Sequence, residues 1–169
     1  MKIVCTALFF VFGALAAGSA PVLAAAIPTA AYSALHFRNI GPTSGRIDAV
    51  TGVTGNSLEY YAGGLGGIFK TTDGGLTWKA IFAHEPVSSI GALATAPSDG
   101  KIVYAGTGEA NLRNDVAFGD GVWRSTDAGV RWQHVGLDAT GSIAAIAVSP
   151  TDANTAFVAA LGDQYAPTT

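Results

Sequence analysis

The chain from residue 46 onward alternates short apolar runs with short polar turns. Runs rich in Val, Ile, Tyr, Phe and Trp are separated by Gly, Asp, Asn, Ser and Pro at regular spacing, which is typical of antiparallel strands joined by tight turns. No segment after residue 26 has a helical period, so we expect no helix of more than two turns there. The predicted strands form three groups: 46–53, 58–63, 67–72 and 77–82; 89–96, 101–107, 121–126 and 131–136; and 142–149 and 155–161.

These three groups are copies of one repeat. The stretch "SIGALATAPSDGKIVYAGTGE" at 89–109 resembles "SIAAIAVSPTDANTAFVAALGD" at 142–163, and a fainter copy, "RIDAVTGVTGNSLEYYAGG", lies at 46–64. The first strands of the copies align on an isoleucine, which is Ile47, Ile90 or Ile143. The repeat length is about 43 residues once an insertion in the second copy is set aside, the length of a four-stranded propeller blade.

The predicted fold is therefore an all-β β-propeller built from four-stranded antiparallel blades. About two and a half blades are expected in this sequence: one at 46–82, one at 89–136 and half a blade at 142–162, together forming a partial propeller over 46–169. Since a closed ring has about four to eight blades, we expect the chain to be a fragment and the remaining blades of the ring to be missing.

A second pattern, [ST]-x-D-x-G-x-x-W, ends the third strand of each complete blade. Asp at a turn accepts hydrogen bonds from backbone N–H groups about two residues on, Gly supplies a positive φ, and Trp packs its large face against the hairpin. A catalytic acid would be needed once, whereas this Asp recurs, so we interpret it as a structural fastener of the turn. The motif residues are Thr71, Asp73, Gly75 and Trp78, and Ser125, Asp127, Gly129 and Trp132.

The up-and-down strand order predicts which loops share a face. The turns of this motif lie on one face, and the inserted loop 108–120 lies on the opposite face, over the mouth of the central channel. Arg46, Glu109 and Asp163 are expected to ring that mouth. Long polar loops on rigid scaffolds often carry function, so we predict a ligand-binding site here. Its candidate residues are Arg46, Glu109, Asn111, Arg113 and Asn114.

The first 26 residues are predicted to be a signal peptide. One basic residue, Lys2, precedes an apolar run and then small residues, and the run is too short to span a bilayer comfortably; a retained membrane anchor is the alternative. We expect a secreted or periplasmic protein that has no membrane contact after cleavage. Residues 27–45 form an N-terminal segment of the kind that completes the last blade of a closed propeller.

Composition narrows the possible partners and cofactors. Twelve acidic and nine basic residues are scattered along the chain, with a net charge of −3, which argues against nucleic acid as a partner. The single cysteine, Cys5, lies inside the predicted signal. The three histidines, His36, His84 and His134, are isolated. We therefore predict no metal site and no cofactor.

The chain resembles a known group of propellers. "TTDGGLTW" and "STDAGVRW" are similar to Asp-box (bacterial neuraminidase, or BNR) repeats. The longer stretch "GTGEANLRNDVAFGDGVWRSTDAGVRW" at 106–132, with "FRNIGPTSGRI" at 37–47, resembles exported bacterial BNR propellers related to the sortilin/Vps10 N-terminal domain, which often carry the label glycosyl hydrolase. The resemblance implies a propeller of about seven to ten blades, of which this chain would hold the first two and a half.

These patterns are compatible with more than one function. The favoured hypothesis is an exported scaffold that binds a protein, peptide or glycan through the face opposite the Asp-box turns. The alternative is a glycoside hydrolase of the BNR or xyloglucanase-like type, which needs two carboxylates beside a cleft. Its candidates are Glu109, Asp115 and Asp120, though no pair stands out, and no catalytic residue is assigned. A sialidase would need three arginines, whereas Ser89 and Ser142 occupy the positions matching Arg46.

Overall fold

The computed structural model of the chain describes residues 28–33, 35, 41–43, 45–111 and 114–162. The chain divides into two units, Met1–Arg38 and Asn39–Thr169. In the first, the described residues form one short 3-10 helix, η1 (Thr29–Tyr32). The predicted signal peptide at 1–26 lies outside the described residues. Across the described ranges, no helix has the length and apolar character needed to cross a membrane.

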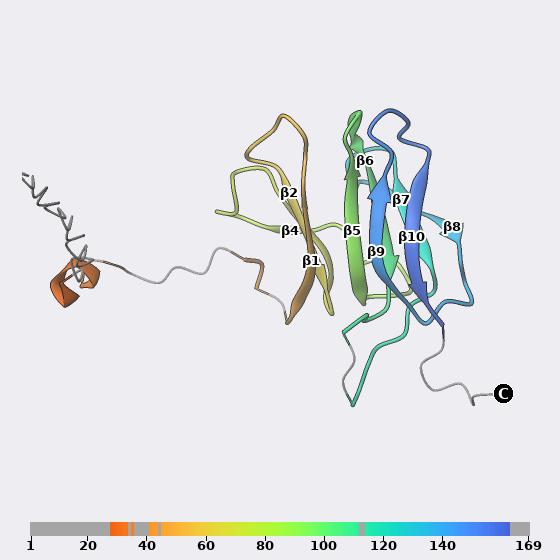
Figure 1. The fold of residues 1–169 in the computed structure, drawn as a ribbon, viewed down its shortest axis with the longest axis horizontal. Coiled ribbons are helices and arrows are strands. Elements are labelled where there is room, and N and C mark those ends of the chain that lie inside the picture. Colours follow the sequence, from red (N-terminus) through yellow and green to blue (C-terminus); the bar gives the residue numbers. More distant parts are fainter. Residues whose placement is uncertain (1–27, 34, 36–40, 44, 112–113, 163–169) are drawn as a thin grey trace, which may run out of the picture. The chain divides into compact units, whose positions relative to one another are not determined.

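The second unit consists of three antiparallel sheets (Figure 1). Blade 1 is a four-stranded sheet in the order β1 (Ile47–Gly52), β2 (Tyr60–Gly64), β3 (Gly67–Thr71) and β4 (Lys79–Ala80). Blade 2 repeats this order with β5 (Ile90–Ala96), β6 (Asp99–Thr107), β7 (Val122–Ser125) and β8 (Gln133–Gly136). The third sheet pairs β9 (Ser142–Val148) with β10 (Ala156–Leu161). The all-β fold of four-stranded propeller blades is thereby confirmed.

The strand boundaries differ from the predicted ones mainly at the outer strands and at one turn. β4 has two residues, Lys79 and Ala80, because the turn before it continues through Trp78 without pairing. β6 begins two residues earlier than predicted, at Asp99, since Ala96 pairs directly with Asp99 across the hairpin. Outer strands have a neighbour on one side only, so their ends depend on turn geometry more than on apolar pattern.

Each first strand carries a β-bulge at the same place. Ile47 pairs with Gly64 and Ala49 with Gly63, so Asp48 is the extra residue on β1. The same register shift leaves Gly91 extra on β5 and Ala144 extra on β9. A bulge changes the direction of the strand and of its unpaired side chain. The repeat is thus conserved between blades down to a single backbone irregularity.

The hydrophobic core lies between the sheets. Blade 1 contributes Tyr61, Ile68 and Phe82, all 2% exposed or less, and these side chains pack against the facing side of blade 2. A second cluster joins the other side of blade 2 to β9 and β10 through Ile143, which is fully buried. Burying a side chain of this size contributes about 1.5–3 kcal/mol each. Stacking of sheets, and not each sheet alone, therefore holds the unit together.

Glycines on the second strands let neighbouring sheets approach closely. A Cβ on Gly63 would collide with the side chain of Ile90, and a Cβ on Gly106 would collide with that of Ile143. Both isoleucines are fully buried. Each isoleucine of a first strand therefore occupies the space left because the facing residue on the preceding blade is a glycine.

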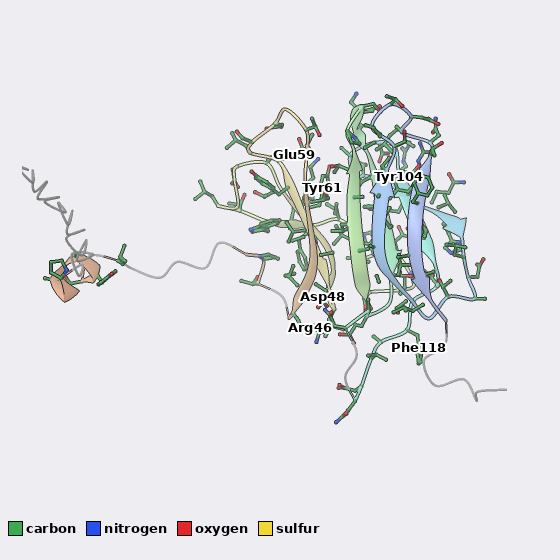
Figure 2. The ribbon with its side chains drawn as sticks, in the orientation of Figure 1. Arg46, Asp48, Glu59, Tyr61, Tyr104 and Phe118 are labelled. Carbon is green, nitrogen blue, oxygen red and sulfur yellow. The ribbon has the colours of Figure 1, made fainter. Side chains whose placement is uncertain are left out.

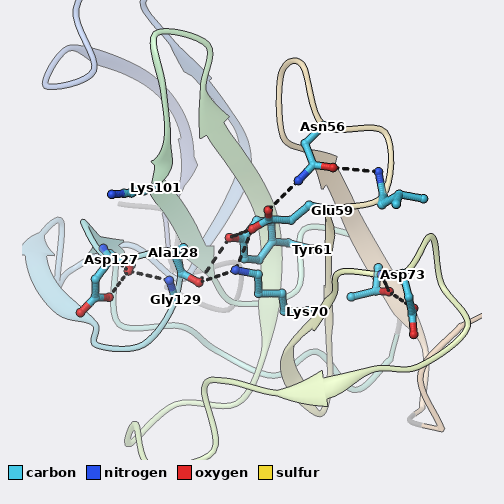
Figure 3. Close-up of polar contacts among 12 residues, drawn as sticks. Asn56, Glu59, Tyr61, Lys70, Asp73, Lys101, Asp127, Ala128 and Gly129 are labelled. Carbon is cyan, nitrogen blue, oxygen red and sulfur yellow. Dashed lines mark hydrogen bonds and ion pairs between the residues drawn. The ribbon is translucent and has the colours of Figure 1, made fainter.

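A polar contact between sheets accompanies this packing (Figure 3). The hydroxyl of Tyr61 and the ammonium of Lys70 both donate to the carbonyl of Ala128 on blade 2, at 3.3 and 3.1 Å. The Glu59 carboxylate pairs with Lys70 Nζ at 2.7 Å and lies 3.2 Å from Tyr61 Oη, where it shares the single phenol proton with the Ala128 carbonyl. Burial and the neighbouring Glu59 carboxylate raise the pKa of the Tyr61 phenol.

The same arrangement recurs between blade 2 and the third sheet. Tyr104 donates to the carbonyl of Ala153 at 2.8 Å, and Arg124 donates to Asn154 Oδ1 at 2.6 Å. The cations of Lys70 and Arg124 also lie over the Tyr61 and Tyr104 rings, 5.2 and 5.4 Å from the centroids. Each sheet is thus joined to the next by one tyrosine and one cation.

Candidate functional site

The loops separate into two groups at opposite ends of the sheets. At one end, Gly74 N donates to Leu58 O at 2.9 Å and Ala128 N donates to Lys101 O at 2.8 Å. These contacts place the two turns 71–78 and 125–132, here called the box turns, beside the hairpins β1–β2 and β5–β6. Figure 2 shows Glu59 and Tyr104 toward this end, and Arg46, Asp48 and Phe118 at the other.

In the first box turn, the side chains of Thr71 and Asp73 satisfy the backbone. Thr71 Oγ1 donates to Asp73 Oδ1 at 2.7 Å and accepts from Gly75 N at 2.9 Å. Asp73 Oδ1 accepts from Thr77 N at 2.9 Å, and Oδ2 accepts from the Thr77 hydroxyl at 2.6 Å. These bonds, led by the Thr77 hydroxyl, lower the pKa of Asp73 to about 2.

The second box turn repeats this network with Ser125 and Asp127. Asp127 accepts from Ser125 Oγ at 2.9 Å and from Arg131 N at 2.8 Å, and the bond from Arg131 N–H is the largest cause of its lowered pKa. Gly75 and Gly129 have φ of 91° and 87°, the positive values that the sequence analysis expected. Both carboxylates are occupied by their own turn.

Two details of the box turns differ from the expectation. The Asp carboxylate accepts from an N–H four residues on, not two, because the Ser or Thr hydroxyl takes the nearer N–H groups. The tryptophan does not pack only on its own hairpin. Trp132 Nε1 donates to Ile81 O of blade 1 at 2.9 Å, and its ring contacts Phe82 edge to face at 5.1 Å. Trp132 therefore joins blades.

At the opposite end, loop 108–120 is held to the first strands. Gly108 N donates to Ser89 O at 2.8 Å and Gly119 N donates to Gly141 O at 2.9 Å. Glu109 closes the loop on itself: its N–H donates to Ala117 O, and its Oε2 accepts from Ala117 N, both at 2.9 Å. The predicted loop position, opposite the box turns, agrees with these contacts.

Glu109 and Arg46 meet at the base of this loop. The Arg46 Nη2 group donates to Glu109 Oε1, while Arg46 Nε donates to Asp48 Oδ1 at 2.8 Å. The Glu109 side chain is fully buried, whereas that of Arg46 is 37% exposed. A carboxylate buried in this way depends on its cation, because an unpaired buried charge is strongly destabilising. Glu109 is therefore an anchor of the loop.

Asp48, which is not among the site residues predicted from sequence, completes the cluster. Its side chain is 5% exposed. Its Oδ1 accepts from Arg46 Nε and from Asn111 Nδ2, the latter at 3.1 Å. Its Oδ2 is buried and has no hydrogen-bond partner, which costs about 1–3 kcal/mol. The signal was present in the repeat alignment, where Gly91 and Ala144 occupy the position that Asp48 takes in blade 1.

The other acidic candidates serve different parts of the loop. Asp120 Oδ1 accepts from Trp123 Nε1 at 2.8 Å and from the Thr107 hydroxyl at 3.1 Å, and the Asp120 carbonyl lies 2.6 Å from His134 Nε2. Asp115 and Asn114 are exposed on the loop. Arg113 and Asp163, which were predicted at the site and the channel mouth, lie outside the described residues.

The structure thus brings together Arg46, Asp48, Glu109 and Asn111 at one end of the sheets, and leaves Asp115 and Asp120 in other environments. Within the described part of the chain, no group of three or more His, Cys, Asp or Glu side chains is arranged to hold a metal ion. The cluster combines a guanidinium, two carboxylates and an amide. These groups can donate hydrogen bonds to a polar ligand and accept them from it.

Comparison with known proteins finds similarity to parts of glycoside hydrolases. No family model matches the chain, so the resemblance to BNR and sortilin-like propellers stays a prediction. The xyloglucanase Xgh74A of Acetivibrio thermocellus is 37% identical over 78 residues, which are 42% of this chain and 8% of the relative.

Among solved structures, an ancestral GH74 enzyme superposes with a TM-score of 0.56 at 24% identity, over 72% of this chain and 16% of that chain. At this identity the likeness concerns the fold. The chain spans less than a fifth of the length of either protein. The described sheets are accordingly part of a β-propeller, similar in fold to a GH74 enzyme and in sequence to part of a xyloglucanase.

Proposed function

We propose that this chain supplies blades to a carbohydrate-active β-propeller that binds a xyloglucan-type polysaccharide. The observation that carries the proposal is the 37% identity over 78 residues with a protein named as a xyloglucanase. The polar cluster opposite the box turns adds to it, because carboxylate, guanidinium and amide groups are suited to sugar hydroxyls. Of the ligand classes predicted from sequence, the glycan is therefore the one kept.

The part played by this chain in the proposal is binding and not bond cleavage. An acid–base pair needs one carboxyl that can give a proton and one that can accept it or attack. Glu109 is buried against Arg46 and Ala117, and Asp120 accepts from Trp123 and Thr107. In this proposal, any hydrolysis by a longer protein uses carboxylates other than these two.

Binding and turnover can be measured on the 169-residue chain. Affinity electrophoresis in gels containing xyloglucan is expected to retard the chain, while gels containing dextran, an α-glucan, do not. A reducing-sugar assay with xyloglucan is expected to give no product. Equal mobility in both gels would refute glycan binding. Release of reducing ends that is abolished by Asp120→Asn or Glu109→Gln would refute the assignment of binding alone.

We also propose that the protein is exported, on the strength of the basic and apolar pattern of residues 1–26. N-terminal sequencing of protein recovered from outside the cytoplasm is expected to begin between about Ala25 and Tyr32. Recovery of that protein with Met1 intact would contradict cleavage.

A further inference from the structure

We propose that Asp48, together with Arg46 and Asn111, forms a subsite for a neutral sugar, in which Asp48 Oδ2 accepts a hydrogen bond from a sugar hydroxyl. The inference rests on the proposed glycan-binding function and names the residues that would carry specificity. It starts from Asp48 Oδ2, a buried carboxylate oxygen with no hydrogen-bond partner.

The fold does not require an acid at this position. Asp48 is the bulge residue of β1, and the matching bulge residues of β5 and β9 are Gly91 and Ala144. All three strands form with the same register shift, so the bulge itself is independent of the side chain. A carboxylate that is not needed for folding, and that leaves one acceptor unsatisfied, is better explained by a ligand than by the scaffold.

Asp48 is held in a fixed direction. Its other oxygen, Oδ1, accepts from Arg46 Nε at 2.8 Å and from Asn111 Nδ2 at 3.1 Å. Arg46 is itself fixed by Glu109, whose side chain is fully buried and bonded to the backbone of Ala117. Such support holds a binding group in place before the ligand arrives, which reduces the entropy lost on binding.

The charges around Asp48 select the class of ligand. The Arg46 guanidinium lies against both Asp48 and Glu109 and offsets one of their two charges, so the remaining negative charge would repel an anionic ligand. Among the described residues, no group of three or more His, Cys, Asp or Glu side chains is arranged to hold a metal ion. A neutral polyhydroxyl compound suits this cluster, since a hydroxyl can donate to Asp48 Oδ2 while another accepts from the exposed part of Arg46 or from the Asn111 amide.

The site also has an accessible approach. The Arg46 side chain is 37% exposed, and Asn111 is exposed at the start of the loop. Arg46 and Asp48 lie at the end of β1 on the side where loop 108–120 projects (Figure 2). A sugar lying across Arg46 and beside the Asn111 amide would reach the carboxylate from this end.

The test compares Asp48→Ala with Asp99→Ala in the full chain. Ala is the residue that β9 carries at the same bulge, so folding should tolerate it. Asp99 caps the β5–β6 hairpin at the opposite end through Lys101 N and controls for the loss of one negative charge. The probe is a xyloglucan heptasaccharide, and calorimetry gives Kd while urea unfolding gives stability.

We expect Asp48→Ala to weaken binding roughly tenfold or more, the effect of losing one hydrogen bond to a charged group, and Asp99→Ala to leave Kd unchanged. Asn111→Ala should weaken binding without affecting the bulge. If wild type binds and Asp48→Ala binds equally well, the subsite is wrong while the glycan function stands. If wild type fails to bind the probe, the proposed function fails with it.

Discussion

At the scale of single residues, the two box turns differ in one position that affects backbone strain. Gly74 in the first turn has φ of 71°, and its counterpart in the second is Ala128, with φ of 60°. A non-glycine residue in the left-handed region is strained by contact between Cβ and its own backbone. Ala128 keeps this conformation because both of its backbone groups are hydrogen-bonded. Its N–H donates to Lys101 O, and its carbonyl accepts from Tyr61 and Lys70.

Replacing Ala128 with glycine should therefore stabilise the protein. The strain relieved is about 1–2 kcal/mol, and the greater freedom of glycine in the unfolded chain removes part of it. We expect a net gain of about 0.5–1 kcal/mol in the free energy of unfolding, read from urea titrations. Gly74→Ala is the reverse substitution at the matching place and should lower the free energy of unfolding. If Ala128→Gly destabilised the protein, or Gly74→Ala stabilised it, the strain argument would be wrong.

The carboxylate of Asp73 makes stability depend on pH. Its pKa is lowered from 3.8 to about 2 by the Thr77 hydroxyl, the Thr77 N–H and the Thr71 hydroxyl. Because the folded-state value lies below the unfolded one, the stabilisation is complete above about pH 4 and is lost as the pH falls toward 2. Asp127 and Asp152 are shifted in the same direction.

Asp73→Ala should consequently unfold at lower urea concentration than wild type near neutral pH, and the difference should shrink between about pH 4 and pH 2. Urea midpoints measured over that range check it. A difference that stays constant with pH would mean that Asp73 stabilises the turn by packing, and not through its charge and hydrogen bonds.

At the scale of elements, neighbouring sheets are fitted together by repeated pairs. Gly63 faces Ile90, and Gly106 faces Ile143. Tyr61 and Tyr104 each donate to a carbonyl of the following sheet. Because these contacts recur, the geometry between blade 1 and blade 2 is repeated between blade 2 and the third sheet.

Gly63→Ala and Gly106→Ala should both destabilise, because the added methyl group would overlap a buried isoleucine. Overpacking of this kind costs about 1–3 kcal/mol, measurable by urea or thermal unfolding. Gly45→Ala is the control, since nothing lies within 4 Å of a Cβ at that position. If Gly63→Ala left the free energy of unfolding unchanged, the sheets could move apart to admit the methyl group, and close contact at Gly63 would not be needed for stability.

An ion pair between Arg46, which precedes β1, and Glu109 is one of the contacts that hold loop 108–120. Arg46→Ala would leave the fully buried Glu109 carboxylate without its cation. We expect the free energy of unfolding to fall by about 2–3 kcal/mol, less than the roughly 3–5 kcal/mol of a fully buried pair, because the guanidinium is partly exposed to water. Adding Glu109→Gln to Arg46→Ala should recover part of the loss. No recovery in unfolding experiments would contradict the dependence of Glu109 on Arg46.

At the scale of the whole second unit, the two outer faces of the stacked sheets are apolar and exposed. On blade 1 the open face includes Val50, 65% exposed, and on the third sheet Phe157 is 76% exposed. The residue of blade 2 that matches Val50 by the repeat is Leu93, which is 8% exposed between the blades. The exposed outer faces thus carry apolar side chains at the same repeat positions as the faces that are buried between sheets.

We expect the 169-residue chain to self-associate with increasing concentration, because exposed apolar faces of this kind favour association. Sedimentation velocity over a range of concentrations measures it. Phe157→Lys should lower the association, whereas Lys101→Ala, an exposed substitution away from these faces, should not. A monodisperse monomer at all concentrations would contradict the expectation.

Much of this architecture could be predicted from sequence, because it is set by local interactions. Strand and turn alternation, the four-strand repeat and the box turns depend on residues close in the chain: Thr71, Asp73 and Thr77 span one turn. Glycine at positive φ in the same turns is likewise a local requirement. These features follow from alternation, turn chemistry and backbone sterics alone.

What only the tertiary structure decided are the contacts between distant residues. Arg46 and Glu109 are 63 positions apart, as are Asp48 and Asn111, and their pairing depends on how blade 2 stacks on blade 1. The same stacking turned Trp132 toward Ile81 and buried Glu109. The sequence alone determined the strands, the repeat and the box turns, whereas packing between sheets determined which polar groups meet and which acceptor, Asp48 Oδ2, is left for a ligand.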